Sequence, residues 1–363
     1  MNQYITFIEP SIESTYSFLS ALLRSRETLI ATNDDLVKAL KSNNIVDAVS
    51  NISHTSIGDF LSKKIRELIS SKAVDAAVYD HLSNELKYIA LNSPRKISNF
   101  IQLYVTKYDV YNILLYIRSI TLKTGAMELI PCGLIAWKGM LNKLINITDL
   151  DTLIDFIHEA GLHIYADLVR INRSLIEAKA EDKFYELESI LMNKYYELLN
   201  AYLAMLGDYL TSTCIRMMID IHNIILVLKK IILGILPDII KKIMIKGGMY
   251  ITHTEYDELL RYERIDQLTN WLKATPYKLL SDKILIALKI FKNNPSILDI
   301  VFKSFNLYNL RITLHSSPLS LQPVITYVVA KELEASKVSL ILRAIVNGSE
   351  REPFEKLLLE IMV

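Results

Sequence analysis

The sequence predicts an all-α protein built from three similar helical modules, and three observations support this prediction. Gly and Pro are scarce, with 10 and 9 residues among 363, against usual frequencies of about 7% and 5%. Apolar residues recur at intervals of three and four over long stretches, whereas alternation by two is not sustained. One amphipathic phrase also occurs three times at nearly even intervals. Few breakers and helical periodicity favour helices, and the even spacing favours a repeat architecture.

The composition narrows the class of protein. Hydrophobic residues make up 51% of the chain, which is enough to give two or three compact units a core. Forty-one basic residues nearly balance 40 acidic ones, so the net charge of +1 gives no reason to expect a nucleic-acid partner. Cys132 and Cys214 are isolated, which predicts neither a disulfide framework nor a metal site and suits a reducing cytoplasm.

No stretch of the sequence predicts a transmembrane helix or a secretory signal. A spanning helix needs about 18 or more uninterrupted apolar residues. The richest stretch, IILVLKKIILGILPDIIKKIMIKGG, is interrupted by charged residues from Lys229 to Lys242. The N-terminus lacks a basic region followed by an apolar core. We therefore expect a soluble protein that can lie beside a membrane.

The repeated phrase is the first expected element. It reads YDVYNILLYIRSI from Tyr108, IDIHNIILVLKKI from Ile219 and LEASKVSLILRAI from Leu333. Each copy has an acid near its start, a polar or charged residue three positions later and a base nine positions after the acid. The acids are Asp109, Asp220 and Glu334, the middle residues are Asn112, Asn223 and Lys337, and the bases are Arg118, Lys229 and Arg343. A fixed composition at steps of 111 and 114 residues indicates a repeat.

A second repeated pattern, here called the ladder, accompanies the phrase. The stretch from Ile130 aligns without a gap with the stretch from Ile245, at an offset of 115, and Gly133 falls on Gly248. A third copy near the N-terminus aligns at an offset of 220, which places Leu29 on Met249. The first ladder is thus N-terminal and the last phrase is C-terminal, so the two chain ends are expected to complete one module.

This order predicts closure of three modules around a pseudo-three-fold axis. Module one covers residues 1–100 and is completed by the C-terminal helix, module two covers residues 101–212, and module three covers residues 213–363 with the closing C-terminal helices. An open superhelix of helix pairs is the alternative, but its repeats usually span about 34 to 47 residues. Between the phrases, Glu181–Leu210 is expected to form one long helix. Its predicted buried face consists of Leu187, Ile190, Leu191, Leu198, Leu199 and Leu203.

The charges of the phrase need partners outside their own helix. Residues three apart share a helix face, whereas residues nine apart lie about 180° from one another. We therefore expect the acid of one module to pair with the base of the next; the alternative is that these charges are solvated or cap helix ends. No histidine or nucleophile accompanies the acid in all three copies, so no catalytic, cofactor-binding or metal site is predicted.

The phrases carry a resemblance to a known family. YDVYNILLYIRS, DIHNIILVLKK, and KELEASKVSLILRAIVNG followed by EPFEKLLLEI resemble the C subunits of archaeal and bacterial A/V-type rotary ATPases, a family whose eukaryotic relative is the d subunit of the vacuolar ATPase. The opening is also similar, with Arg24, Arg26 and an element at Ile52 and Thr55. The resemblance covers essentially the full chain, and its specificity comes from order and spacing. The chain departs from the family at RSITLKTG, after the first phrase, at Lys229 in place of an arginine and at Lys337 in place of an asparagine.

The resemblance implies a mechanical function. It implies a funnel of three helical domains that receives the D and F subunits of the central shaft at one end and sits on the membrane proteolipid ring at the other. Such a protein transmits torque between proton or sodium flow and ATP synthesis or hydrolysis, as a monomer within a larger hetero-complex at the cytoplasmic face of the membrane. It binds no nucleotide itself, and the sequence contains no GxxxxGK[ST] motif.

Two other functions fit the residues alone. One is an α-helical scaffold that binds a protein or peptide, and the other is a peripheral protein that binds the membrane surface. The segment from Lys229 to Lys246 carries five lysines and one aspartate. Its candidate residues for facing the ring or lipid head groups are Lys230, Lys241, Lys242 and Lys246. The alternative is that these lysines lie at ordinary helix ends, where the helix dipole favours them.

Overall fold

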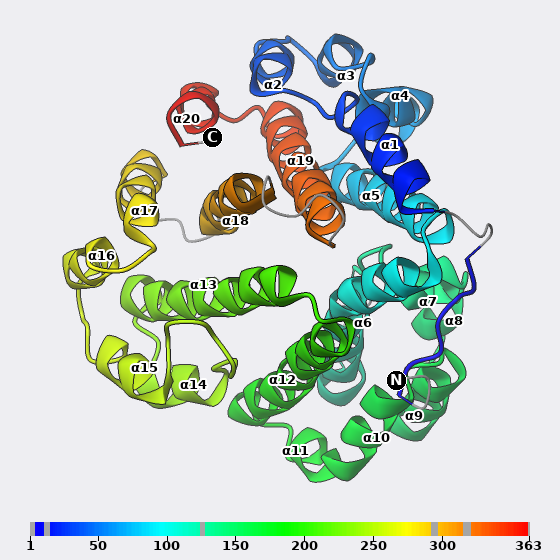
Figure 1. Cartoon of the computed structure of the whole chain (residues 1–363), viewed down its shortest axis with the longest axis vertical. Coiled ribbons are helices and arrows are strands. Elements are labelled where there is room, and N and C mark those ends of the chain that lie inside the picture. Colours follow the sequence, from blue (N-terminus) through cyan, green and yellow to red (C-terminus); the bar gives the residue numbers. More distant parts are fainter. Residues whose placement is uncertain (1–3, 11–14, 124–127, 292–296, 315–320, 362–363) are drawn as a thin grey trace. The chain divides into compact units, whose positions relative to one another are not determined.

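The computed structural model describes the chain except for residues 1–3, 11–14, 124–127, 292–296, 315–320 and 362–363 (Figure 1). The described residues form helices and connecting loops and contain no strand. The predicted all-α class is therefore confirmed. None of the helices in these described parts is both long enough and apolar enough to span a bilayer.

The described chain divides into two compact units. Unit 1 comprises Met1–Tyr16, Ser83–Asn223 and Leu236–Thr254, and unit 2 comprises Ser17–Leu82, Ile224–Ile235 and Glu255–Val363. Two long helices, α5 (Ser71–Leu91) and α13 (Tyr209–Leu233), pass from one unit to the other, as does the short α15 (His253–Leu259). The division into three modules is not tested by these units and stays a prediction.

Unit 1 is built on long helices that pack through buried apolar and aromatic side chains. Two tyrosines of α12 (Glu181–Leu206) donate hydrogen bonds to backbone carbonyl oxygens of α6 (Arg95–Leu122). Tyr195 Oη donates to that of Tyr104 at 2.9 Å, and Tyr202 Oη to that of Lys96 at 2.9 Å. Its helices besides those shared are α6 (Arg95–Leu122), α7 (Leu134–Trp137), α8 (Leu141–Ile145), α9 (Leu150–Glu159), α10 (His163–Ile171), α11 (Arg173–Glu177), α12 (Glu181–Leu206) and α14 (Pro237–Lys242).

The long helix expected over Glu181–Leu210 ends earlier than predicted. It stops at Leu206 because Gly207, at φ +71°, adopts the left-handed conformation that terminates helices, and α13 begins at Tyr209. Five of the six residues predicted to be buried are buried, whereas Ile190 is only half-buried; the five are Leu187, Leu191, Leu198, Leu199 and Leu203. The apolar periodicity continues across the break, which explains why the pattern alone suggested one helix.

Unit 2 pairs the long helix α19 (Gln322–Val346) with elements from the N-terminal part of the chain. Figure 1 shows α19 beside α2 (Asn33–Leu40) and α18 (Leu298–Leu314), and α19 packs on both. The contact expected between the N-terminal ladder and the C-terminal phrase is thus present. The remaining elements are α1 (Tyr16–Glu27), α3 (Ile45–Asn51), α4 (Ser56–Lys63), η1 (Ile65–Glu67), α16 (Ile265–Lys273), α17 (Lys278–Ile290), α20 (Glu352–Lys356) and η3 (Leu357–Ile361).

The short ladder helices begin at polar capping residues. Thr32, Asn44 and Thr55 accept hydrogen bonds from backbone N–H groups at the start of α2, α3 and α4, and Asp149 does the same for α9. Such caps satisfy donors that a helix start leaves unpaired. Frequent caps therefore explain why these apolar segments form several short helices.

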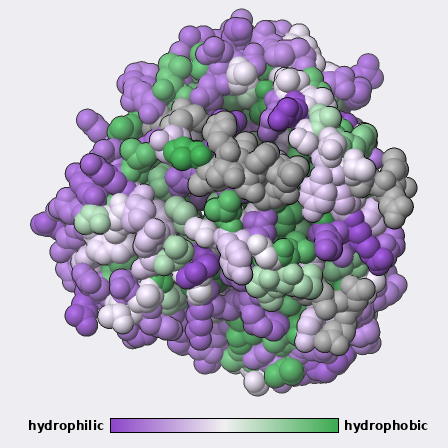
Figure 2. All heavy atoms as spheres, viewed as in Figure 1, coloured by the Kyte–Doolittle hydropathy of each residue, from purple (hydrophilic) through white to green (hydrophobic). Residues whose placement is uncertain are grey.

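The visible surface is mainly hydrophilic. Figure 2 shows hydrophilic residues over much of the face in view, with hydrophobic residues in smaller areas between them. Exposed apolar side chains include Ile171 and Tyr209 in unit 1 and Ile69 and Leu359 in unit 2. Single exposed apolar residues of this kind are normal for a folded protein.

Candidate functional site

The first repeated acid, Asp109, accepts hydrogen bonds from the backbone of the ladder that begins at Ile130. It lies in the middle of α6 and is completely buried. Its Oδ2 accepts a hydrogen bond from the Leu134 N–H at 2.7 Å, and its Oδ1 accepts one from the Ile135 N–H at 2.9 Å. These donors belong to the first residues of α7, where a helix has no internal acceptor for them. One turn further, Asn112 exchanges two hydrogen bonds of 2.8 Å with the backbone of Ile130.

The second acid repeats this arrangement. Asp220 of α13 is completely buried and accepts hydrogen bonds from three consecutive backbone N–H groups, those of Met249 at 3.0 Å, Tyr250 at 2.7 Å and Ile251 at 3.1 Å. Asn223 exchanges two bonds with the backbone of Ile245, at 2.8 and 3.0 Å. We call the acid and the N–H groups that it binds a clamp.

The third clamp joins the two ends of the chain sequence within unit 2. Glu334 of α19 accepts a hydrogen bond of 2.7 Å from the Ala31 N–H, just before α2, and its other carboxylate oxygen pairs with the buried Lys331 ammonium. Lys337 donates to Asn33 Oδ1 at 2.8 Å. The offset of 220 places Ala31 on Ile251, which is a donor to the second clamp. The same ladder position is therefore bound in both clamps.

The observed partners of the repeated acids and bases differ from the expected pairing between modules. The carboxylates of Asp109, Asp220 and Glu334 bind the ladder of their own repeat, and the Arg118 and Arg343 guanidiniums lie near other acids, Glu188 at 3.5 Å and Asp75 at 3.3 Å. The reason is that backbone N–H groups at the start of a helix or in the loop before it need an acceptor, and a carboxylate can accept from two or more of them at once. The signal was present in the sequence, because Gly133 and Gly248 mark the loops that approach the acids.

The glycines matter because the acids lie against them. A Cβ on Gly133, which has φ +107°, would lie 2.5 Å from Asp109 Oδ1, and a Cβ on Gly248 would lie 1.9 Å from Asp220 Oδ1. No side chain fits at such distances without displacing the carboxylate. In both of these repeats, the buried acid therefore requires a glycine at the aligned position of the loop.

The three repeated bases lie in different surroundings. The Arg118 guanidinium lies near the rings of Phe184 and Tyr185, 5.8 and 5.5 Å from their centroids. Lys229 is exposed near the end of α13. Arg343 lines a pocket of unit 2. The base position therefore shows no common contact across the described copies.

We expect the stability of the protein to depend on the ionisation of Asp109. Burial raises the pKa of Asp109 to about 7, although the N–H groups of Ile135 and Leu134 and the Lys138 ammonium lower it. Because the folded state then binds the proton more tightly than the unfolded state, stability falls as pH rises from about 4 to about 7. Between pH 8 and pH 5 the wild type should gain about 3 kcal/mol relative to Asp109→Asn. Urea unfolding of both proteins at each pH measures this difference; a difference that is constant with pH would contradict it.

The basic segment is only partly exposed. Lys230, expected to face a membrane or ring, is instead buried, with 8% of its surface exposed, and its Nζ donates to the Tyr262 carbonyl oxygen at 2.7 Å. A buried ammonium needs such an acceptor. Lys241, Lys242 and Lys246 are exposed, and Lys242 pairs with Glu186 at 2.8 Å and with Asp182 at 3.3 Å. The three exposed lysines, Lys241, Lys242 and Lys246, thus stay candidates for contact with a partner surface.

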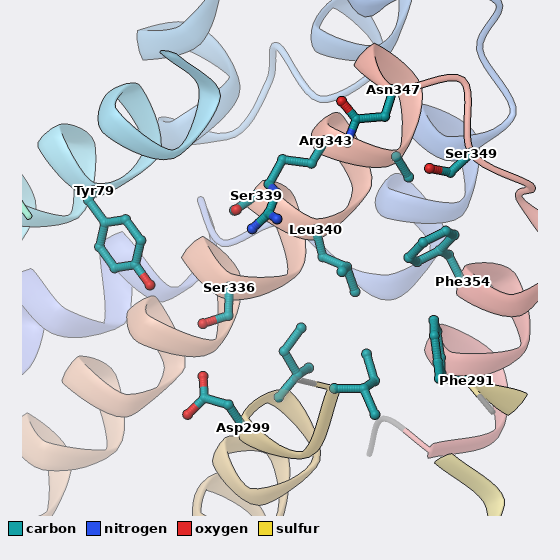
Figure 3. Close-up of a pocket in the computed structure, with 13 residues that line it drawn as sticks. Tyr79, Phe291, Asp299, Ser336, Ser339, Leu340, Arg343, Asn347, Ser349 and Phe354 are labelled. Atoms are coloured by element: carbon teal, nitrogen blue, oxygen red, sulfur yellow. The ribbon is translucent and has the colours of Figure 1, made fainter. Parts of the chain in front are cut away.

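Unit 2 contains a pocket of about 360 Å³ beside the C-terminal half of α19 (Figure 3). Figure 3 shows Ser336, Ser339 and Arg343 reaching it from α19, with Tyr79 on one side. The rings of Phe291 and Phe354 close another side, with centroids 5.4 Å apart. Hydroxyl, guanidinium and ring groups suit non-covalent contact with a partner. Among the residues that the structure describes, no cluster of three or more His, Cys, Asp or Glu side chains could hold a metal ion.

Comparison with known proteins relates the whole arrangement to one family. The model of the family described as ATP synthase (C/AC39) subunit matches residues 19–356. The chain is 21% identical over 355 residues to the C subunit of the A-type ATP synthase of Methanocaldococcus jannaschii, covering 95% of this chain and 86% of that protein. It is 21% identical over 352 residues to the protein of the same name from Pyrococcus abyssi, covering 95% and 90%, and 22% identical over 344 residues to that of Desulfurococcus sp., covering 94% and 90%.

Proposed function

The chain belongs to the ATP synthase (C/AC39) subunit family and is a rotary ATPase subunit, and we propose that it acts there as a non-catalytic coupling subunit. The observation that carries this proposal is the match along almost the entire chain, since a coupling role needs the whole body rather than one motif. The proposed coupling protein joins the D and F subunits of the central shaft to the membrane proteolipid ring. It transmits torque between ion flow and ATP synthesis or hydrolysis.

The clamps support this proposal because a torque-transmitting body must keep its shape under load. Each buried acid ties the start of a ladder to a long helix through hydrogen bonds that its side chain accepts from backbone N–H groups. Two clamps stiffen unit 1 and one stiffens unit 2. A rigid all-helical body requires no bound nucleotide to perform this function.

The finer arrangement is part of the proposal. We propose three modules with the boundaries 1–100, 101–212 and 213–363 around a pseudo-three-fold axis, in a peripheral protein at the cytoplasmic face of the membrane. The exposed Lys241, Lys242 and Lys246 are proposed to face the proteolipid ring, because cationic groups favour a polar, anionic surface. Lys230 is excluded from this role by its burial.

Co-elution tests the coupling proposal. The purified chain is mixed with a complex of the D and F subunits and, separately, with a detergent-solubilised proteolipid ring, and each mixture is resolved by size-exclusion chromatography. We expect co-elution with both. A Lys241→Glu, Lys246→Glu double variant should lose the ring and keep the shaft, whereas Lys273→Glu, a change at an exposed lysine of α16, should keep both.

Each other outcome rejects a defined part of the proposal. Co-elution of the folded chain with neither partner would reject coupling and favour a helical scaffold. Binding to protein-free anionic liposomes that is lost in moderate salt, without binding to the ring, would favour a lipid-binding protein. Unchanged ring binding by the double variant would reject the role of the two lysines alone.

A further inference from the structure

Residues 244–246 of unit 1 are bound by side-chain amides from two helices, α12 and α13. On the α12 side, Asn193 donates to the Met244 carbonyl oxygen at 3.1 Å and accepts from the Lys246 N–H at 2.8 Å. On the α13 side, Asn223 exchanges two hydrogen bonds with the backbone of Ile245. Successive residues of an extended chain face opposite sides. Two amides, one on each helix, therefore bind three consecutive residues through their backbone.

In the repeat that contains Glu334, the part of the chain that aligns with residues 244–246 is placed differently. The alignment places Lys337 on Asn223 and Ser25 on Ile245. Ser25 belongs to the helix α1, and its hydroxyl donates to the Leu22 carbonyl oxygen at 2.9 Å. Ser25 is thus part of a helix, and Lys337 donates its hydrogen bond to Asn33 rather than to the backbone of Ser25. The place equivalent to that of residues 244–246 is not filled by the equivalent part of the chain.

A cavity of about 500 Å³ lies at this place, in unit 2. Leu307 and Arg311 line it from α18, and Ala330 and Lys337 are among the residues that line it from α19. Its volume is within the range of about 300 to 1,000 Å³ that is usual for ligand sites. Thr326, which is 2% exposed, also lines it, and its buried hydroxyl has no hydrogen-bond partner in the structure. A buried unpaired hydroxyl favours a ligand that carries a polar backbone.

The charges of the cavity favour an acidic ligand. Burial, together with the nearby charges of Arg311 and Lys283, lowers the pKa of Lys337 to about 8, although the charge of Glu334 acts in the opposite direction. Three acids also line the cavity. Glu334 is engaged by Lys331 and the Ala31 N–H, Asp34 lies in the first turn of α2, and burial raises the pKa of Glu27. A carboxylate placed between Arg311 and Lys337 would relieve their mutual repulsion.

We propose that the groove between α18 and α19 binds an extended acidic segment of a partner protein. The backbone of that segment lies along the groove as residues 244–246 lie between α12 and α13, and its carboxylate lies between Lys337 and Arg311. This inference rests on the equivalence of the two places in the repeat and on their lining residues, and it is independent of the proposed coupling function.

Peptide selection tests the inference without knowledge of the partner. A phage-displayed library of random seven-residue peptides is selected on the full-length chain, and the consensus peptide is synthesised with a fluorescent label for anisotropy titration. We expect enrichment of Asp or Glu at one position. The consensus peptide should bind Arg311→Glu and the groove-filling Ala330→Phe variant at least tenfold more weakly than the wild type.

Matched variants keep the test decisive. Lys273→Glu makes the same change of charge at an exposed position of α16 that is not among the residues that line the cavity, and should bind within twofold of the wild type. Arg311 is exposed, so its substitution should leave the fold intact even where Ala330→Phe does not. Absence of enriched peptides, enrichment without acidic residues, or binding to Arg311→Glu within twofold of the wild type would each overturn the inference.

Discussion

Replacing Asp220 with alanine should lower the free energy of unfolding by about 3 to 5 kcal/mol, because it leaves three backbone N–H groups, one buried and two partly buried, without their acceptor. Each buried donor that loses its partner costs about 1 to 3 kcal/mol, and a neighbouring water recovers part of this. Urea unfolding followed by circular dichroism measures the loss. Hydrogen exchange should also accelerate locally at Met249, Tyr250 and Ile251.

Asp238→Ala is the matched control, since Asp238 is exposed in the first turn of α14. It removes one carboxylate without uncovering a buried donor, and we expect a change below about 0.5 kcal/mol. A similar small loss for Asp220→Ala would show that the clamp contributes little to stability. The rigidity argument for torque transmission would then lose its main support.

Replacing Gly248 with alanine should be nearly as costly, with an expected loss of at least ~3 kcal/mol. The new Cβ would lie 1.9 Å from Asp220 Oδ1. That carboxylate is fixed by three hydrogen bonds, so it cannot move away without breaking them. The same unfolding measurement applies.

Two comparisons separate the clash from backbone strain. The adjacent Gly247 has φ +88° and open space around its Cβ position, so Gly247→Ala should cost only about 1 to 2 kcal/mol. In the Asp220→Ala background the clash with the carboxylate disappears, and Gly248→Ala should then cost less than ~1 kcal/mol. Strict additivity of the two substitutions would contradict the predicted contact.

The repeats were the part of the architecture most readily predicted. The spacing of Asp109, Asp220 and Glu334 and the alignment of Gly133 with Gly248 were visible in the sequence, and the structure places each of these acids against its aligned ladder. Helical periodicity predicted the long helices, but it missed the end of α12, because one glycine at positive φ outweighs a continuing apolar pattern. Local conformation at single residues is not encoded in periodicity.

The partners of the charges could not be predicted. Sequence spacing showed that Asp109 and Arg118 point away from each other, yet it could not show that the nearest unsatisfied groups around Asp109 are backbone N–H groups 25 and 26 residues further along. The same limit applies to Lys230, whose ammonium meets a carbonyl oxygen 32 residues away and is buried rather than facing a surface. Backbone donors and acceptors are identical at every residue, so a pattern of side chains does not reveal them.

The sequence by itself determined the helical class, the three occurrences of the phrase and the family resemblance, because these depend on periodicity, order and spacing. The tertiary structure decided what the repeated residues do: acids bind backbone N–H groups at helix starts or in the loops before them, one lysine is buried, and a cavity lies at one of two equivalent places in the repeat. The physical reason is that hydrogen-bond partners and burial depend on which segments meet in space. Composition and spacing limit which contacts between segments are possible, but only the folded structure shows which of those contacts form.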